Sequence, residues 1–87
     1  MRYTVIWLRP AEAELARIWL GADDRDVISH ATNGIDQLLK VQPHTAGESR
    51  SEGKRILLVA PLGVTFRVDE DDRLVRVADV WRFRTRP

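Results

Sequence analysis

Arginine dominates the side chains of this sequence that could do chemistry. Of the 14 basic residues, only Lys40 and Lys54 are lysine. The planar guanidinium group of arginine binds phosphate through two parallel hydrogen bonds, which a lysine ammonium group cannot form. The composition therefore indicates groups suited to a phosphate-bearing ligand, and a bias of the genome toward arginine codons is an alternative explanation.

The charges are distributed unevenly along the chain, although the net charge is only +1. Residues 73–87 contain five arginines and one acid, Asp79, which gives a balance of +4. Residues 12–26 contain five acids and two arginines, which gives a balance of −3. A basic C-terminal segment is suited to binding nucleic acid or an acidic protein, and a solvated tail is the alternative.

Several other kinds of chemistry are excluded by what the sequence lacks. It contains no cysteine, so it forms no disulfide and no thiolate metal site. Its two histidines, His30 and His44, are not spaced like metal ligands. A glycine-rich phosphate loop, a nucleophile elbow and a dinucleotide fingerprint are all absent. We therefore expect neither a metal nor a cofactor.

The length of 87 residues fits one domain spanning residues 1–87. Hydrophobic residues make up 44% and charged residues 31%, which is typical of a soluble globular protein. No apolar run approaches the roughly 18 residues that span a bilayer, and the N-terminus lacks the pattern of a signal peptide. We expect a cytoplasmic protein with no membrane partner.

The first half of the chain predicts a strand followed by two helices. Residues 3–8 are rich in β-branched and aromatic residues, which favours a strand. Pro10 suits a first helical turn, and Gly21 suits the end of that helix. A second helix is expected to begin at Asp23 or Asp24, whose carboxylate would cap the free N–H groups, and to end before Pro43.

The second half predicts three strands joined by short connections. Residues 42–53 are interpreted as a loop that contains the start of a strand, and residues 55–60 as a strand. Residues 61–63 are expected to form a tight turn. Alternation over residues 64–68 indicates a half-buried strand, and residues 74–83 form the last one. Thr65 and Arg67 are expected on the same face.

Together these elements predict an α+β fold with the order β-α-α-β-β-β. The connections between the last three strands are too short for parallel crossovers, so these strands form an antiparallel meander. The two helices form a hairpin that packs on one face of the sheet, because neither helix can bury its apolar stripe alone. Thr65 and Arg67 would then lie on the opposite face.

The order of elements, the length and the residue pattern resemble the RelE/ParE superfamily over nearly the whole chain. The stretches that carry the resemblance are PHTAGESR leading into a strand, the hairpin VTFRVDEDD and the ending VADVWRF. The resemblance implies the toxin component of a type II toxin–antitoxin system, neutralised by a cognate antitoxin. RelE-like members cut messenger RNA at the ribosome, whereas ParE-like members inhibit DNA gyrase.

The resemblance also implies a set of candidate site residues. Cleavage of RNA by its own 2′-hydroxyl needs a base, cations that stabilise the charged phosphorane, and an acid for the leaving oxygen. RelE-like members supply these groups from the meander and the C-terminal segment, without a metal. The corresponding groups here are a tentative base, Glu48, and a cationic surface made of Arg50, Lys54, Arg55, Arg67 and Arg82.

Two departures from the RelE pattern leave the other activity open. The arginine that usually lies three residues before the aromatic residue of its strand is replaced by Gly63, which precedes Phe66. The C-terminal tyrosine or histidine of several relatives is replaced by Phe83, which cannot exchange a proton. A ParE-like gyrase inhibitor and a non-toxic interaction module are therefore the alternatives.

Each candidate residue also has a purely structural interpretation. Arg67 and Arg82 could be solvated strand residues paired with acids. Lys54 and Arg55 could protect a strand edge from aggregation. The tryptophans at positions 7, 19 and 81 are expected to form core or antitoxin contacts rather than platforms for bases. Apolar area around the helices would be covered by an amphipathic antitoxin helix.

Overall fold

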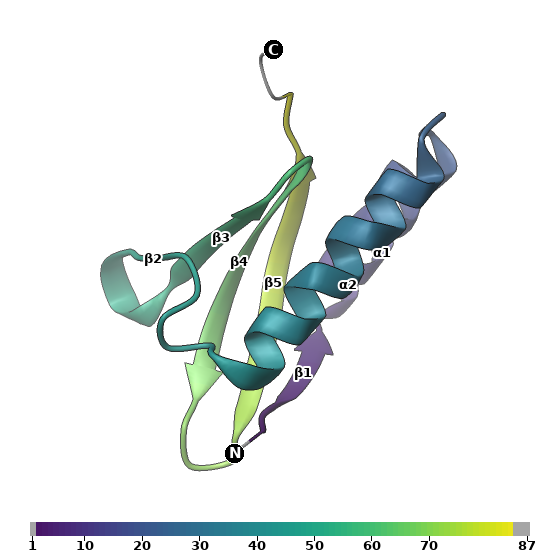
Figure 1. Cartoon of the computed structure of the whole chain (residues 1–87). Coiled ribbons are helices and arrows are strands. Elements are labelled where there is room, and N and C mark those ends of the chain that lie inside the picture. The colour runs from purple at the N-terminus through teal and green to yellow at the C-terminus, as the bar shows by residue number, and fades with distance from the viewer. Residues whose placement is uncertain (1, 85–87) are drawn as a thin grey trace.

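The computed structural model of this chain describes residues 2–84. It contains two helices, five strands and one short 3-10 turn (Figure 1). In chain order these are β1 (Thr4–Trp7), α1 (Arg9–Leu20), α2 (Arg25–Val41), β2 (Glu48–Ser49), η1 (Ser51–Gly53), β3 (Arg55–Val59), β4 (Leu62–Asp69) and β5 (Leu74–Arg82).

The strands form one sheet in the order β1-β5-β4-β3-β2. The pairs from β2 to β5 are antiparallel, which confirms the predicted meander, whereas β1 runs parallel to β5. Parallel neighbours need a crossover connection, and the pair α1–α2 lies in the connection between β1 and the meander. Both helices lie on the same face of the sheet, as predicted, and we call the other face the open face (Figure 1).

The core lies between the helix pair and the inward face of the sheet. Helix α2 contributes the fully buried Ile28, Ile35 and Leu39, which recur at helical spacing. The central strands contribute side chains with no exposed area, namely Leu62, Val64, Phe66, Val75 and Val77. Full burial of each such side chain stabilises the fold by about 1.5–3 kcal/mol, so this layer fixes the position of the sheet.

A bulge in the β4–β5 pair adjusts the two strands to this core. Thr65 pairs with Asp79, whereas the next residue, Phe66, pairs with Val77, so Ala78 is the extra residue. The extra residue lets both Val77 and Val80 of β5 point into the core. The regular alternation along β4 places Phe66 inward and Arg67 on the open face, as predicted.

Two local predictions were wrong. The turn predicted at residues 61–63 lies earlier, at Ala60 and Pro61, because β4 already begins at Leu62, whose side chain is buried in the core. The residue before α2 is Asp24, as predicted, but its side chain makes no capping hydrogen bond. The carboxylate binds Arg82 instead. No helix within residues 2–84 is long and apolar enough to cross a membrane.

Candidate functional site

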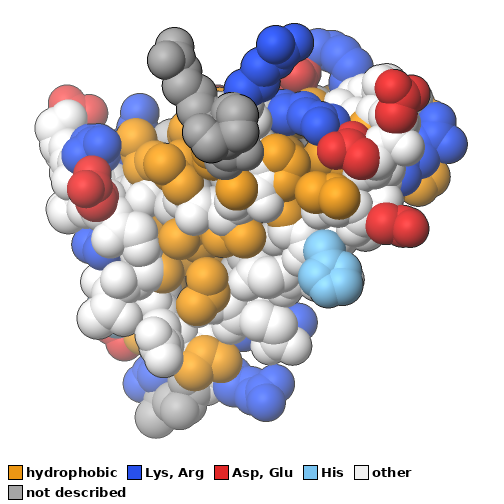
Figure 2. Space-filling model, turned by 45° about the horizontal axis from the view of Figure 1, so that its top comes forward, with side chains coloured by type: hydrophobic (Ala, Val, Ile, Leu, Met, Phe, Trp, Pro, Cys, Tyr) orange, Lys and Arg blue, Asp and Glu red, His pale blue; other side chains and the backbone are white. Residues whose placement is uncertain are grey.

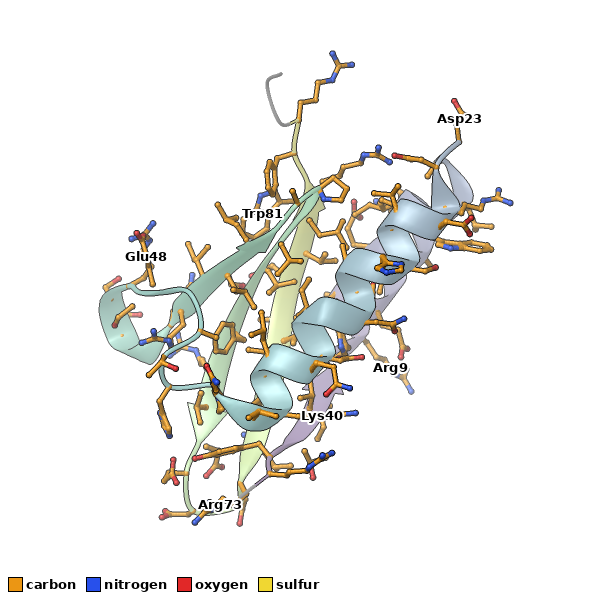
Figure 3. The ribbon with its side chains drawn as sticks, viewed as in Figure 1. Arg9, Asp23, Lys40, Glu48, Arg73 and Trp81 are labelled. Atoms are coloured by element: carbon orange, nitrogen blue, oxygen red, sulfur yellow. The ribbon has the colours of Figure 1, made fainter. Side chains whose placement is uncertain are left out.

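The segment from β2 to the start of β3 extends the sheet at one end of the open face. Gly47 allows this, because its φ is +69° and a Cβ there would lie 2.0 Å from the carbonyl oxygen of Ile56. The chain then reverses through η1, where the Arg50 N–H donates to the Lys54 carbonyl at 2.7 Å. Glu48, Arg50 and Lys54 are thus held along one edge of the sheet, and Glu48 lies far from the helix hairpin tip (Figure 3).

Arg67 reaches this edge from β4. Its guanidinium donates to the backbone carbonyl of Glu52, and its Nη1 lies 3.5 Å from the position of a Cβ added to Gly53. Within residues 2–84, no carboxylate forms an ion pair with Arg67. Because a neutral carbonyl cannot compensate the charge, this guanidinium retains its attraction for an anion.

Arg76 is a further cation that the sequence interpretation did not include. It lies directly opposite Arg67 across the β4–β5 pair, so two like charges share one position of the sheet. Asp69 compensates Arg76 in part, at 3.4 Å. The sequence could have indicated this position, because a hairpin that pairs Asp69 with Leu74 also places Arg76 opposite Arg67. We call Arg50, Lys54, Arg67 and Arg76 the cationic cluster.

Two carboxylates lie along the next row of the open face. Glu48 pairs with Ile56, Ile56 with Thr65, and Thr65 with Asp79 across four strands. The Glu48 side chain is 71% exposed and forms an ion pair with Arg50 at 2.9 Å. The hydroxyl of the buried Thr65 donates to Asp79 at 2.6 Å. The base candidate therefore lies beside the cations, and Asp79 is a second carboxylate that the sequence interpretation missed.

Two of the six predicted site residues lie elsewhere. Arg55 pairs with Phe66, and its guanidinium donates to the carbonyls of Ala46 at 3.1 Å and Gly47 at 3.3 Å. These bonds hold the loop before β2. The structure therefore brings together Glu48, Arg50, the backbone of Lys54 and Arg67, but it directs the Arg55 side chain into a structural role.

Arg82 lies at the opposite end of the sheet from the cationic cluster. It donates to both carboxylate oxygens of Asp24, at 3.0 and 2.8 Å, which ties the helix hairpin to the end of β5. The Arg82 guanidinium holds the pKa of Asp24 below its usual value, and the same contact raises the pKa of Arg82. This pair compensates its own charge.

The position of the missing RelE-like arginine is covered by an aromatic ring. Gly63 pairs with Trp81, and a Cβ added to Gly63 would lie 2.5 Å from two atoms of the indole ring. No side chain at position 63 could therefore occupy this part of the open face unless Trp81 moved. The departure from the RelE pattern thus involves two residues that fit each other.

A second polar cluster lies at the corner where β1 begins. The Tyr3 hydroxyl donates to Glu70 at 2.8 Å and lies 3.1 Å from the His44 Nε2, and His44 also pairs with Glu70. The hydrogen bond to Glu70 raises the pKa of Tyr3, and the bonds from Tyr3 and His44 lower the pKa of Glu70. These contacts join three segments of the chain. Within residues 2–84, no group of three or more acidic or histidine side chains is arranged to hold a metal.

Two grooves border the helices, and the one along α1 and α2 is mainly apolar. One, of about 500 Å³, lies along α1 and α2 and is lined by Leu15, Trp19 and Leu20. The other, of about 700 Å³, lies between α2 and the sheet, and its lining mixes the apolar Val27 and Pro61 with the charged Asp24 and Arg82. Figure 2 shows hydrophobic side chains gathered across the face that turns toward the viewer. Exposed apolar area therefore surrounds the helices, as the sequence predicted.

Comparison with solved structures relates this fold to known ones. A chain of the toxin–antitoxin complex RelBE2 from Mycobacterium tuberculosis matches with a TM-score of 0.78 and 18% identity, covering 94% of this chain and 99% of that one. A chain of the chromosomal ParDE system from P. aeruginosa matches with a TM-score of 0.71 and 22% identity, covering 95% and 98%.

The isolated RelE toxin from E. coli also matches, with a TM-score of 0.68 and 14% identity, covering 97% of this chain and 87% of that one. No protein-family model and no curated protein matches the sequence. The predicted RelE/ParE-like fold is thus confirmed. Both RelE and ParE systems are among the similar structures, so the fold does not separate their activities.

Proposed function

We propose that this chain is the toxin of a type II toxin–antitoxin system and that it cuts messenger RNA at the ribosome through the cationic cluster. The similarity of the fold to structures of toxin–antitoxin systems supports the first part. The second part depends on one observation above all: Arg67 lies opposite Arg76 with its charge uncompensated by any described carboxylate, on the face that the helices leave open. A local patch of this kind suffices to bind phosphate.

Glu48 and the residues of the cationic cluster fit the three requirements of cleavage by the 2′-hydroxyl. Glu48 accepts the 2′-hydroxyl proton, and the 2′-oxygen attacks the phosphorus atom. Arg67 and Arg76 stabilise the negative charge of the phosphorane. The bond from phosphorus to the 5′-oxygen then breaks, Lys54 donates a proton to that oxygen, and a 2′,3′-cyclic phosphate remains. This scheme uses no metal, and Arg50 orients Glu48.

Induced expression followed by primer extension on translated messages tests this function. We expect growth arrest together with new 5′ ends inside messages. The Arg67→Ala variant is the matched control, because Arg67 forms no described ion pair whose loss would unfold the protein. Intact messages in growth-arrested cells would exclude the proposed nuclease activity. Harmless expression without the antitoxin would indicate a non-toxic module.

A second candidate function is inhibition of DNA gyrase without cleavage. The observation that favours it is the indole of Trp81 over Gly63, which replaces a guanidinium by an apolar ring on the open face. Phe83 also supplies no proton. A supercoiling assay with the purified chain decides the question directly, because a gyrase that keeps its full rate excludes this candidate.

The cognate antitoxin is the partner that the apolar groove along α1 and α2 supports. An amphipathic antitoxin helix would place its apolar side chains against Leu15, Trp19 and Leu20. We expect the product of a neighbouring gene to form a stable complex with the chain and to raise its thermal midpoint. A monodisperse chain that gains no stability from that product would contradict this partner.

A further inference from the structure

The three tryptophans occupy different environments. Trp7 packs against the core and donates its Nε1–H to Asp36 at 2.9 Å. Trp19 lies on α1, and the guanidinium of Arg25 stacks on its ring at 4.6 Å. Trp81 is the tryptophan that lies on the open face of the sheet, where it pairs with Gly63 (Figure 3). Neither a core contact nor a contact with the helices therefore explains Trp81.

The indole of Trp81 lies flat on the β4 backbone. A Cβ added to Gly63 would lie 2.5 Å from Cε2, 2.5 Å from Cζ2 and 2.8 Å from Nε1, so three ring atoms are nearly equidistant from one point above the strand. This is the arrangement of a ring that presents its face to the backbone rather than its edge. Since one face covers Gly63, the other face is directed away from the sheet. The side chain is only partly buried.

The ring and the cationic cluster share one face of the sheet. Arg67 lies four positions after Gly63 along β4, which is about 13 Å at roughly 3.3 Å per residue. The Thr65–Asp79 pair lies between them. A flat aromatic ring beside a row of cations is the combination with which proteins bind single-stranded nucleic acid, since bases stack on the ring and phosphates bind the cations.

We propose that Trp81 stacks on an unpaired base of the RNA whose phosphates bind the cationic cluster. This inference rests on the proposed RNA-directed function. A base held in a duplex is already stacked on its neighbours and cannot lie on the indole. The small size of Gly63 is required because any Cβ would lift the ring from the sheet.

Binding of a 2′-O-methyl oligoribonucleotide to the full chain tests this inference, because such an oligonucleotide binds without being cut. We expect Trp81→Leu to weaken single-strand binding by about tenfold or more, and Trp81→Phe to retain most of it. Trp19→Leu is the matched control, since this tryptophan lies on α1, and it should leave the affinity unchanged. The corresponding duplex should bind more weakly than the single strand.

A second readout covers the case in which Trp81→Leu does not fold. In a Trp7→Phe/Trp19→Phe variant, Trp81 is the one tryptophan, and we expect the single strand to quench its fluorescence. Unchanged emission at saturating RNA would overturn the stacking contact.

The outcomes separate this inference from the function on which it rests. If Arg67→Ala loses binding while Trp81→Leu retains it, the stacking contact is wrong and the phosphate site stands. If the wild-type chain binds neither single strand nor duplex, the RNA-directed function fails first. If Trp81→Leu keeps its RNA affinity but loses its affinity for the antitoxin, Trp81 is a protein contact and the inference is overturned.

Discussion

At the end of the sheet where β4 begins, Arg82 donates to both carboxylate oxygens of Asp24, whereas near the other end of β4 Arg67 donates to the neutral carbonyl of Glu52. The first guanidinium is compensated within the chain and connects two elements. The second keeps its charge on the open face, opposite Arg76. The difference shows that the partner of an arginine, rather than its presence, separates a structural role from a binding role.

The largest expected effect comes from breaking the end that carries the cationic cluster. Gly47→Ala would place a Cβ 2.0 Å from the Ile56 carbonyl oxygen at a positive φ, so β2 and η1 cannot remain beside β3. We expect a loss of about 3 kcal/mol of unfolding free energy, measured by urea denaturation. Gly34→Ala is the control, because its Cβ would meet Val59 at an ordinary 3.6 Å. Equal midpoints for the two variants would contradict this role.

The second prediction removes the uncompensated guanidinium. Arg67→Ala should slow cleavage of a translated message by about 100-fold, because a donor aimed at the charged phosphorane is lost. Its stability should change by less than about 0.5 kcal/mol, because the side chain is exposed and forms no described ion pair. Cleavage in a reconstituted translation reaction measures the rate. A variant as fast as the wild type would show that the cluster takes no part.

The third prediction concerns the compensated end. Arg82→Ala should retain cleavage but lower the thermal midpoint at pH 7 by about 4 °C, because it releases the helix hairpin from β5. The Arg82 guanidinium holds the pKa of Asp24 in the folded chain below the usual aspartate value of 3.8, so this pairing stabilises the fold above pH 3.8. That stability is lost as the pH falls through the lowered pKa. The difference in midpoint between the two proteins should therefore close in acid, and a difference that persists would refute the assignment.

The smallest expected effect concerns the corner at β1. Tyr3→Phe removes the hydrogen bond to Glu70 and should lower the thermal midpoint at pH 7 by about 2 °C. The pKa of Tyr3 is raised above 10.0, so this contribution is complete below pH 10 and is lost as the pH rises through the raised value. Thermal melts at neutral and alkaline pH measure both the lower midpoint at pH 7 and the loss of this difference at high pH. A difference in thermal midpoint between the wild type and Tyr3→Phe that widens above pH 10 would contradict the predicted direction of this pH dependence.

Local patterns were sufficient to predict most of the fold. The helical spacing of Ile28, Ile35 and Leu39 and the alternation around Phe66 reflect burial of one face, which depends on neighbours close in sequence. The pairing of β1 with β5 could not be predicted in this way. It joins residues about 70 positions apart, such as Thr4 and Leu74, and depends on how the finished layers pack.

The site was predicted less completely than the fold, for the same reason. Arg82 had the right residue type, but its partner Asp24 is 58 residues away, and no local pattern connects them. Arg76 could have been found from the short hairpin register. The contact of Trp81 with Gly63 required both the register and the position of the bulge, which shifts the pairing after Thr65.

The most direct test is primer extension on translated messages after the wild type, Arg67→Ala and Arg82→Ala are induced in parallel. It asks whether RNA is cut at the end of the sheet that carries the uncompensated Arg67. The proposed mechanism predicts new 5′ ends and growth arrest with the wild type and Arg82→Ala, and intact messages with Arg67→Ala at equal protein levels. Cleavage that survives Arg67→Ala but disappears with Arg82→Ala would contradict it.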